Sequence, residues 1–122
     1  MMDFEFIDTK NDAHVFHVSE KVYEQLFNLG IDKIVQEEEI EIRIEGELYP
    51  IEAIQLSDDN RRKLKKFLLE RIFDKIDNLY RMNAEVLLRN ENIRFDIKFM
   101  YAVKQLIKEM DNNENKWFQL NP

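Results

Sequence analysis

Hydrophobic and polar residues alternate along the first part of the chain, which predicts β-strands there. The runs FEFID (4–8) and AHVFHV (13–18) have this pattern, and the TKND between them is typical of a tight turn. The two runs therefore predict a first β-hairpin. The histidines of the second run, His14 and His17, are three residues apart, so their side chains should lie on opposite faces of the strand.

A second hairpin is predicted in the run EIEIRIEGELYPIEAIQL (39–56). Its isoleucines at 40, 42 and 44 alternate with charged residues, which predicts one buried and one exposed face. Glu45 and Gly46 are expected to form the tight turn between its strands. Pro50 cannot donate a ladder hydrogen bond, so the return strand should lie at an edge or contain a bulge.

Three helices are predicted from apolar residues at helical spacing. A short helix follows Ser19, a good N-cap, and should end at Gly30. Ser57 should cap a long helix whose apolar stripe continues from Leu64 to Leu87. After RNEN (89–92), a second long helix is predicted with an apolar stripe that extends to Met110. Its start is left open, because residues 93–99 also alternate as a strand would.

The predicted order of elements is ββαββαα. It indicates the α+β class: a four-stranded antiparallel sheet of two hairpins, one short helix, and a long helical hairpin packed on one face. The 122 residues are enough for one domain. We expect a single domain over 1–122, with an acidic, sheet-rich half (1–57), a helical half (58–111) and a tail (112–122).

The composition argues against an enzyme. The chain has no cysteine, and its two serines are better explained as helix caps than as nucleophiles. Histidines on opposite strand faces cannot share a metal, so no metal and no cofactor are predicted; whether His14 or His17 has any chemical role is left open. No apolar run is long enough to cross a membrane, so we expect a cytoplasmic protein that does not bind membranes.

Charge is unevenly distributed along the chain. The net charge is −7, but residues 1–57 contain fourteen acids and four bases, whereas residues 58–122 contain eleven acids and fourteen bases. The first part therefore has a net charge of −10 and the second of +3. Such a field steers association with oppositely charged partners and makes it depend on salt.

The long helix begins with RRKLKK, which places five positive charges within six residues. The five bases are Arg61, Arg62, Lys63, Lys65 and Lys66. Three of them lie on the arc of the later apolar stripe, so we expect this end of the helix to overhang the core and to be neutralised by the acidic rim of the sheet. The alternatives are phosphate binding to a nucleic acid and protein docking.

The long helix also shows a possible seam for a second copy of the chain. Ile76, Leu79, Asn83 and Val86 follow three-four spacing, and one polar residue such as Asn83 can set the register of a coiled coil. This spacing is the basis for an alternative in which the chain is a homodimer. The favoured interpretation is that the helix packs on its own sheet, because its apolar arc is broader than such a seam.

The polar tail ends in an aromatic pair, Trp117 and Phe118. Such a segment either folds back onto the core or docks on a partner, and folding back is favoured for an isolated chain. Both residues are kept as candidate protein-binding residues, because aromatic side chains are the commonest binding anchors.

These patterns together predict a small acidic cytosolic protein-interaction module that binds a basic surface of another macromolecule and performs no catalysis. Inhibitors, immunity proteins and regulators can bind in this way, with an acidic surface that contacts a basic one. The outward acids predicted to make the contact are Glu37, Glu38, Glu39, Glu41 and Glu47. The alternative function is a nucleic-acid-binding regulator that uses the five bases of RRKLKK.

Overall fold

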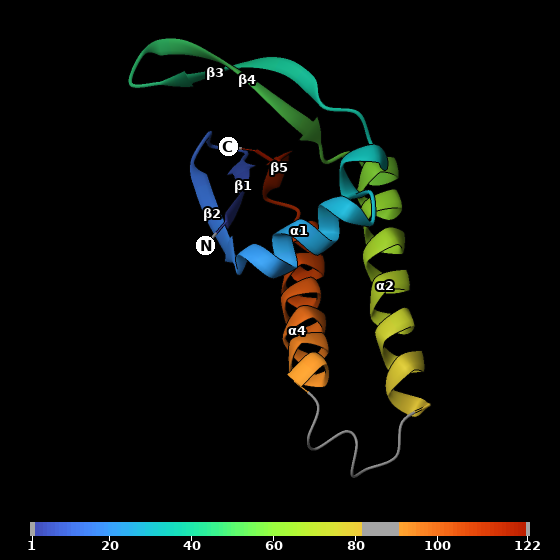
Figure 1. Ribbon diagram of the computed structural model, residues 1–122. Coiled ribbons are helices and arrows are strands. Elements are labelled where there is room, and N and C mark those ends of the chain that lie inside the picture. Colours follow the sequence, from blue (N-terminus) through green and yellow to red (C-terminus); the bar gives the residue numbers. More distant parts are fainter. Residues whose placement is uncertain (1, 82–90, 122) are drawn as a thin grey trace.

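The computed structural model describes residues 2–81 and 91–121, which form a five-stranded antiparallel sheet and helices that pack on it (Figure 1). Along the chain the elements are β1 (Met2–Asp8), β2 (Ala13–Val18), α1 (Glu20–Asn28), a short 3-10 helix (Ile31–Lys33), β3 (Glu38–Ile44), β4 (Glu47–Gln55), α2 (Asp58–Tyr80), α4 (Glu91–Asp111) and β5 (Asn115–Gln119). The strand order in the sheet is β2-β1-β5-β4-β3.

The predicted mixture of helices with an antiparallel sheet is confirmed, but the predicted four strands and the order ββαββαα are wrong. The tail supplies a fifth strand, β5, which lies in the centre of the sheet between β1 and β4. Phe118 is in register with Phe6 on one side and with Ile54 on the other. The last segment of the chain therefore joins the two predicted hairpins into one sheet.

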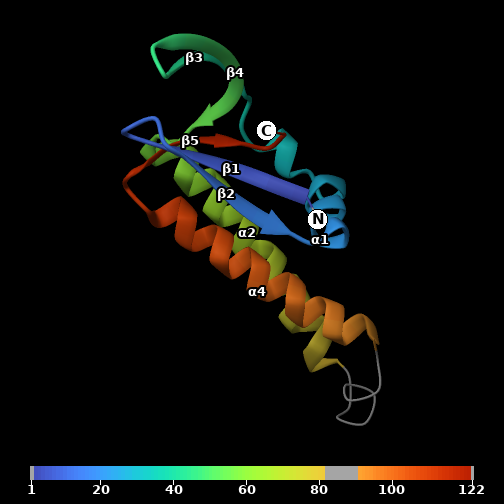
Figure 2. The same ribbon diagram turned by 90° about the vertical axis from the view of Figure 1, so that its left-hand side faces the viewer.

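The main core lies between the sheet and the helix pair α2–α4, which crosses one face of the sheet (Figure 2). Phe118 packs between Phe4 and Phe6, with ring centroids 5.5 and 4.9 Å away. The helices contribute fully buried residues such as Leu68 and Phe99. Burying one such side chain stabilises the fold by roughly 1.5–3 kcal/mol relative to leaving it exposed.

Both faces of the sheet are covered at β1. Phe6 and Ile7 are consecutive, so their side chains point to opposite faces, yet each is only 1% exposed. Strand register places Ile7 on the same face as Trp117, and alternation along β4 adds the fully buried Ala53 to that face. A second, smaller apolar layer therefore lies on the side of the sheet opposite the helices.

The β3–β4 hairpin extends beyond the rest of the sheet and arches above it (Figure 1). Among the described residues, β4 pairs with β5 only at Ile54 and Gln55. The predicted buried face of this hairpin is therefore only partly correct: Ile42 is buried, whereas Ile44 is 45% exposed. Pro50 lies in the part of β4 that, among the described residues, pairs with β3 alone, which agrees with the predicted edge position.

Local signals at the ends of elements are confirmed. The hydroxyl of Ser19 accepts a hydrogen bond from the amide of Val22, and that of Ser57 accepts one from Asn60. Gly30 adopts the left-handed conformation (φ 97°) that ends α1. Glu45 and Gly46 both have positive φ (52° and 85°), as a type I′ hairpin turn requires.

Two open points about the helices have different outcomes. Residues 93–99 are helical, within α4. The described part of the long helix ends at Tyr80, so the predicted continuation of its apolar stripe to Leu87 lies outside the described residues, as do Asn83 and Val86 of the predicted dimer seam. Among the helices that the structure describes, none has the length and apolar character needed to cross a membrane.

Candidate functional site

The acids predicted to bind a partner lie on or beside the protruding hairpin, but they do not share one face. Residues directly opposite each other in an antiparallel pair point to the same face, and faces alternate along a strand. Glu39 and Glu41 therefore lie on one face of the hairpin, together with Glu52 of β4. Glu38 and Glu47 lie on the other face, beside the isoleucines of β3. Sequence analysis did not select Glu52, because the register was needed to place it.

Glu39 stands directly opposite Glu52 in the β3–β4 register. Like charges at such a position destabilise strand pairing. Glu37, just before β3, is half-buried, and this desolvation raises the pKa of its carboxyl group, which Glu52 and Asp32 raise further. Negative charge is thus concentrated on this side of the hairpin, and each ionised carboxylate disfavours the ionisation of its neighbours.

Apolar side chains accompany these acids near the tip of the hairpin. Ile44 is 45% exposed, Leu48 53% and Tyr49 44%. The hydroxyl of Tyr49 donates a hydrogen bond to the carboxylate of Glu47 (2.8 Å). The tip therefore offers an acidic rim with apolar contact area, which is the composition of many protein-binding surfaces.

The first base of RRKLKK, Arg61, has a structural role. Its guanidinium donates hydrogen bonds to the backbone carbonyls of Leu56 (2.8 Å), Met110 and Asn112 (3.0 Å), and also to that of Asn115. These carbonyls lie at the end of β4, at the end of α4 and at the start of β5. Arg61 therefore joins three segments. Its guanidinium donors are used by these carbonyls and are not free to bind a phosphate.

The other four bases are also largely neutralised within the molecule. Arg62 and Lys63 both pair with Asp59 in the first turn of α2, and Lys65 pairs with Asp111 at the end of α4. Lys66 is exposed and forms no ion pair among the described residues. The prediction that the bases meet the acidic rim of the sheet is therefore wrong in its partners, which are helix carboxylates and carbonyls.

A groove runs beside the first half of α2. It has a volume of about 640 Å³ and is lined by apolar side chains, including Leu69, Phe73 and Met110, and by the bases at the start of the helix. Its charged lining also includes acids, among them Glu70 and Asp111. The groove is thus mixed in charge, whereas nucleic-acid binding needs a continuous positive surface.

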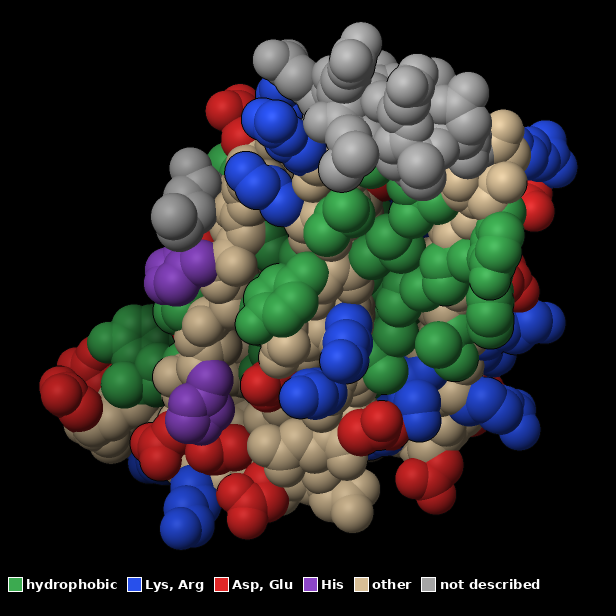
Figure 3. Space-filling view, turned by 90° about the horizontal axis from the view of Figure 1, so that it is seen from below, with side chains coloured by type: hydrophobic (Ala, Val, Ile, Leu, Met, Phe, Trp, Pro, Cys, Tyr) green, Lys and Arg blue, Asp and Glu red, His purple; other side chains and the backbone are tan. Residues whose placement is uncertain are grey.

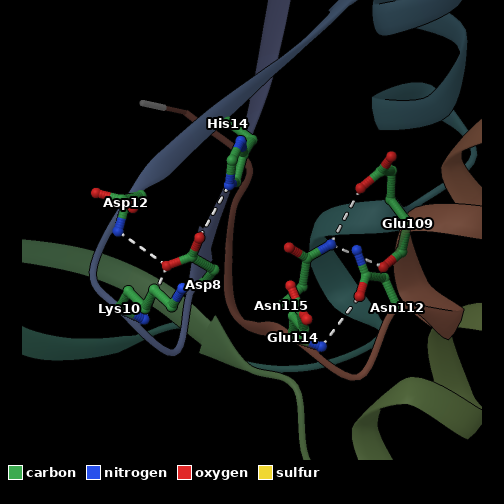
Figure 4. Close-up of polar contacts among 8 residues, drawn as sticks. All are labelled: Asp8, Lys10, Asp12, His14, Glu109, Asn112, Glu114 and Asn115. Atoms are coloured by element: carbon green, nitrogen blue, oxygen red, sulfur yellow. Dashed lines mark hydrogen bonds and ion pairs between the residues drawn. The ribbon is translucent and has the colours of Figure 1, made fainter.

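A small polar pocket of about 260 Å³ lies at the β1–β2 turn and the end of α4 (Figure 4). His14 points to Asp8, with 3.0 Å between His14 Nε2 and Asp8 Oδ2. Opposite them, the side-chain amide of Asn115 donates to the carboxylate of Glu109 (3.0 Å). His17 lies on the other face of β2, as the sequence predicted, and there it contacts Asp3.

The chemistry of this pocket is that of an ion pair. The hydrogen bond with Asp8 raises the pKa of His14, and the same bond lowers the pKa of the Asp8 carboxyl. In the described ranges 2–81 and 91–121, no group of three or more potential ligands has the geometry to hold a metal ion. The pocket is lined by polar side chains, and its close pairs are His14 with Asp8 and Asn115 with Glu109.

The aromatic pair in the tail is part of the fold. Phe118 is fully buried in the main core, so its proposed use as an anchor for a partner is wrong. Trp117 is half-buried on the opposite face of β5. The favoured prediction, that this segment folds back onto the core, is confirmed, with the added finding that it does so as a central strand.

No protein-family model matches the chain, and neither do any curated protein or any solved structure. The functional argument therefore depends on the charges, contacts and exposed surfaces of this chain itself.

Proposed function

We propose that this protein is a non-catalytic interaction module that binds a basic surface of another macromolecule through the β3–β4 hairpin. The observation that carries this proposal is the placement of the hairpin: among the described residues its pairing with the rest of the sheet is confined to Ile54 and Gln55, and its ribbon extends beyond the body of the molecule (Figure 1). A cytosolic location, inferred from the composition, belongs to the same proposal.

The contact face is the one formed by Glu39, Glu41 and Glu52. All three are exposed, and the Glu39–Glu52 pair opposes strand pairing instead of supporting it. Proteins tend to break such local rules at functional sites, where the cost is offset by the function. Among the other predicted acids, Glu38 and Glu47 lie on the opposite face and Glu37 is half-buried, so these three are peripheral to the contact.

A lysine-rich peptide of defined sequence is a suitable probe for this face. The triple variant Glu39→Gln, Glu41→Gln, Glu52→Gln should bind the peptide at least about tenfold more weakly than the unmodified protein at low salt. The matched control is Glu20→Gln, Glu24→Gln, Glu114→Gln, which removes three exposed carboxylates outside the hairpin and changes the net charge equally. Equal weakening in both variants would show that only net charge matters and would refute the assigned face.

The alternative, a nucleic-acid-binding regulator, gains no comparable support. Arg61 is occupied by carbonyls, and three of the remaining bases are paired with Asp59 or Asp111. Titration of fluorescent DNA and RNA at low salt tests it directly, because non-specific binders reach dissociation constants of about 10⁻⁴–10⁻⁶ M.

A further inference from the structure

One side of α2 exposes large apolar residues to solvent. Leu69 is 42% exposed, Phe73 65% and Tyr80 86%. Seen from below, hydrophobic side chains gather in patches on the molecule, with lysine and arginine side chains beside them (Figure 3). At 100° per residue these three residues belong to one stripe of six positions, which begins with two bases and ends with an aromatic ring. Its six positions are Arg62, Lys66, Leu69, Phe73, Ile76 and Tyr80.

The spacing of this stripe is four, three, four, three, four, so it is the same in both directions along the helix. This is the alternation of core positions in a two-stranded coiled coil. If a second α2 lies antiparallel against the first, the midpoint falls at the level of Arg71. Leu69 then faces the second copy's Phe73, and Arg62 faces the second copy's Tyr80. An arginine over a tyrosine ring is a favourable cation–π contact.

Charge along α2 selects the antiparallel arrangement. Bases occupy the first half of its exposed side, where Lys66 has no ion pair among the described residues. Acids occupy the second half: Asp74 and Asp77 are 68% and 65% exposed. The ion pair of Asp77 with Arg81 is exposed on both sides and therefore weak enough to be exchanged, and Asp74 is 3.6 Å from the half-buried Arg71. An antiparallel copy places Lys66 within one turn of the second copy's Asp74 and Asp77, whereas a parallel copy places like charges together.

The groove beside α2 fits this partner. Its apolar part includes Leu69 and Phe73, and Arg62 and Lys66 line it towards the start of the helix. In the antiparallel arrangement, the second copy's Tyr80 reaches the level of Arg62. The most exposed aromatic side chain among the described residues thereby enters a groove with an apolar lining and a cationic end.

We propose that the protein forms a symmetric homodimer through the exposed stripe of α2, with the two helices antiparallel. The contact is isologous, so each groove receives the other copy's Tyr80. It shares only Ile76 with the seam predicted from the sequence. Leu79 is half-buried and lies one turn beyond Lys75, which pairs with Asp96 of α4, so the proposed stripe is centred nearer to Phe73 than to Leu79. The proposal is independent of the hairpin, which lies elsewhere on the molecule.

Sedimentation velocity over a concentration series to about 1 mM measures this association. The unmodified chain should shift from monomer to dimer. Phe73→Ser should weaken the dimer by at least about tenfold, because it removes the central apolar contact twice. The matched control is Tyr101→Ser on α4, whose side chain is equally exposed (66%) but lies outside the stripe; it should leave the dimer unchanged.

A charge exchange tests the antiparallel geometry. Lys66→Asp alone and Asp77→Lys alone should each be mostly monomeric, because each creates two like-charge contacts in its own homodimer. An equimolar mixture should form a one-to-one heterodimer, because both contacts become attractive. Circular dichroism establishes that each variant is folded. A monomeric variant then shows a weakened interface and not a loss of folding.

Single cysteines give a second measure of orientation, because the chain has none of its own. Glu70→Cys lies near the midpoint and should form an intermolecular disulfide. Asp77→Cys should not, because an antiparallel arrangement separates the two copies by about 18 Å along the helix axis. A monomer at every concentration, a dimer insensitive to Phe73→Ser, or no heterodimer in the mixture would overturn the proposal.

Discussion

The guanidinium of Arg61 connects the start of α2 with the end of α4 and the start of β5 through hydrogen bonds to backbone carbonyls. Asn115 completes this junction, because its side-chain amide donates to the backbone carbonyl and the carboxylate of Glu109. Charged donors to partly buried carbonyls are among the stronger hydrogen bonds in proteins. The central strand β5 thus depends on a residue that the sequence placed in a basic cluster.

Replacing Arg61 should therefore destabilise the fold. Arg61→Ala removes the donors and leaves partly buried carbonyls unpaired, and we expect the free energy of unfolding to fall by about 2–4 kcal/mol. Urea denaturation measures this loss. Lys63→Ala is the matched control, because that side chain is 54% exposed, lies outside the exposed stripe of α2 and, among the described residues, pairs with Asp59 alone; it should cost less than about 0.5 kcal/mol. Equal costs for the two variants would contradict the structural role of Arg61.

The His14–Asp8 pair should stabilise the fold over a limited range of pH. The pKa of His14 is raised, so its contribution to stability is present below 6.5 and is lost as pH rises through the raised value in the folded state. The pKa of Asp8 is lowered, so its contribution is present above 3.8 and is lost as pH falls through the lowered value. The pair therefore contributes fully between pH 3.8 and 6.5, and its contribution is lost progressively outside this window.

NMR titration of the His14 ring tests this assignment. The midpoint should lie above 6.5 in the unmodified protein and should fall towards that value in Asp8→Asn, because the largest cause of the shift is the hydrogen bond with Asp8. An unchanged midpoint in the variant would refute the role of Asp8.

At the scale of elements, local patterns predicted most helices and strands because caps and alternation act over a few residues. Ser19, Ser57 and Gly30 set helix ends as expected. β5 was missed because its five residues follow a polar segment and their partners are far away in the sequence. Likewise, the partners of the basic cluster depend on where α4 ends, which local periodicity does not specify.

The β3–β4 hairpin should be the least stable described part of the sheet, because its outer half is paired only within itself and exposes Ile44 and Leu48. Isolated two-stranded hairpins are at best marginally stable. Native-state hydrogen exchange should show amides of residues 41–49 exchanging at least about tenfold faster than those of β1 and β5. Equal protection would mean that the hairpin is held by contacts beyond those described.

At the scale of the whole molecule, the described structure separates an acidic projection from a helical face that is apolar and mixed in charge. The charge asymmetry between the two parts of the chain was readable from the sequence. Which acids share a face was not, because it depends on the register of β3 with β4. In the proposed assembly, two antiparallel α2 helices would join two protomers and leave each hairpin free to bind a partner.

The most direct test of the account is capture of a partner from a lysate of the organism that encodes the protein. The unmodified chain and the control Glu20→Gln, Glu24→Gln, Glu114→Gln should retain the same partner, and retention should fall as salt increases. The variant Glu39→Gln, Glu41→Gln, Glu52→Gln should lose it. Equal capture by all three proteins would contradict the claim that the acidic face of the hairpin is the binding surface.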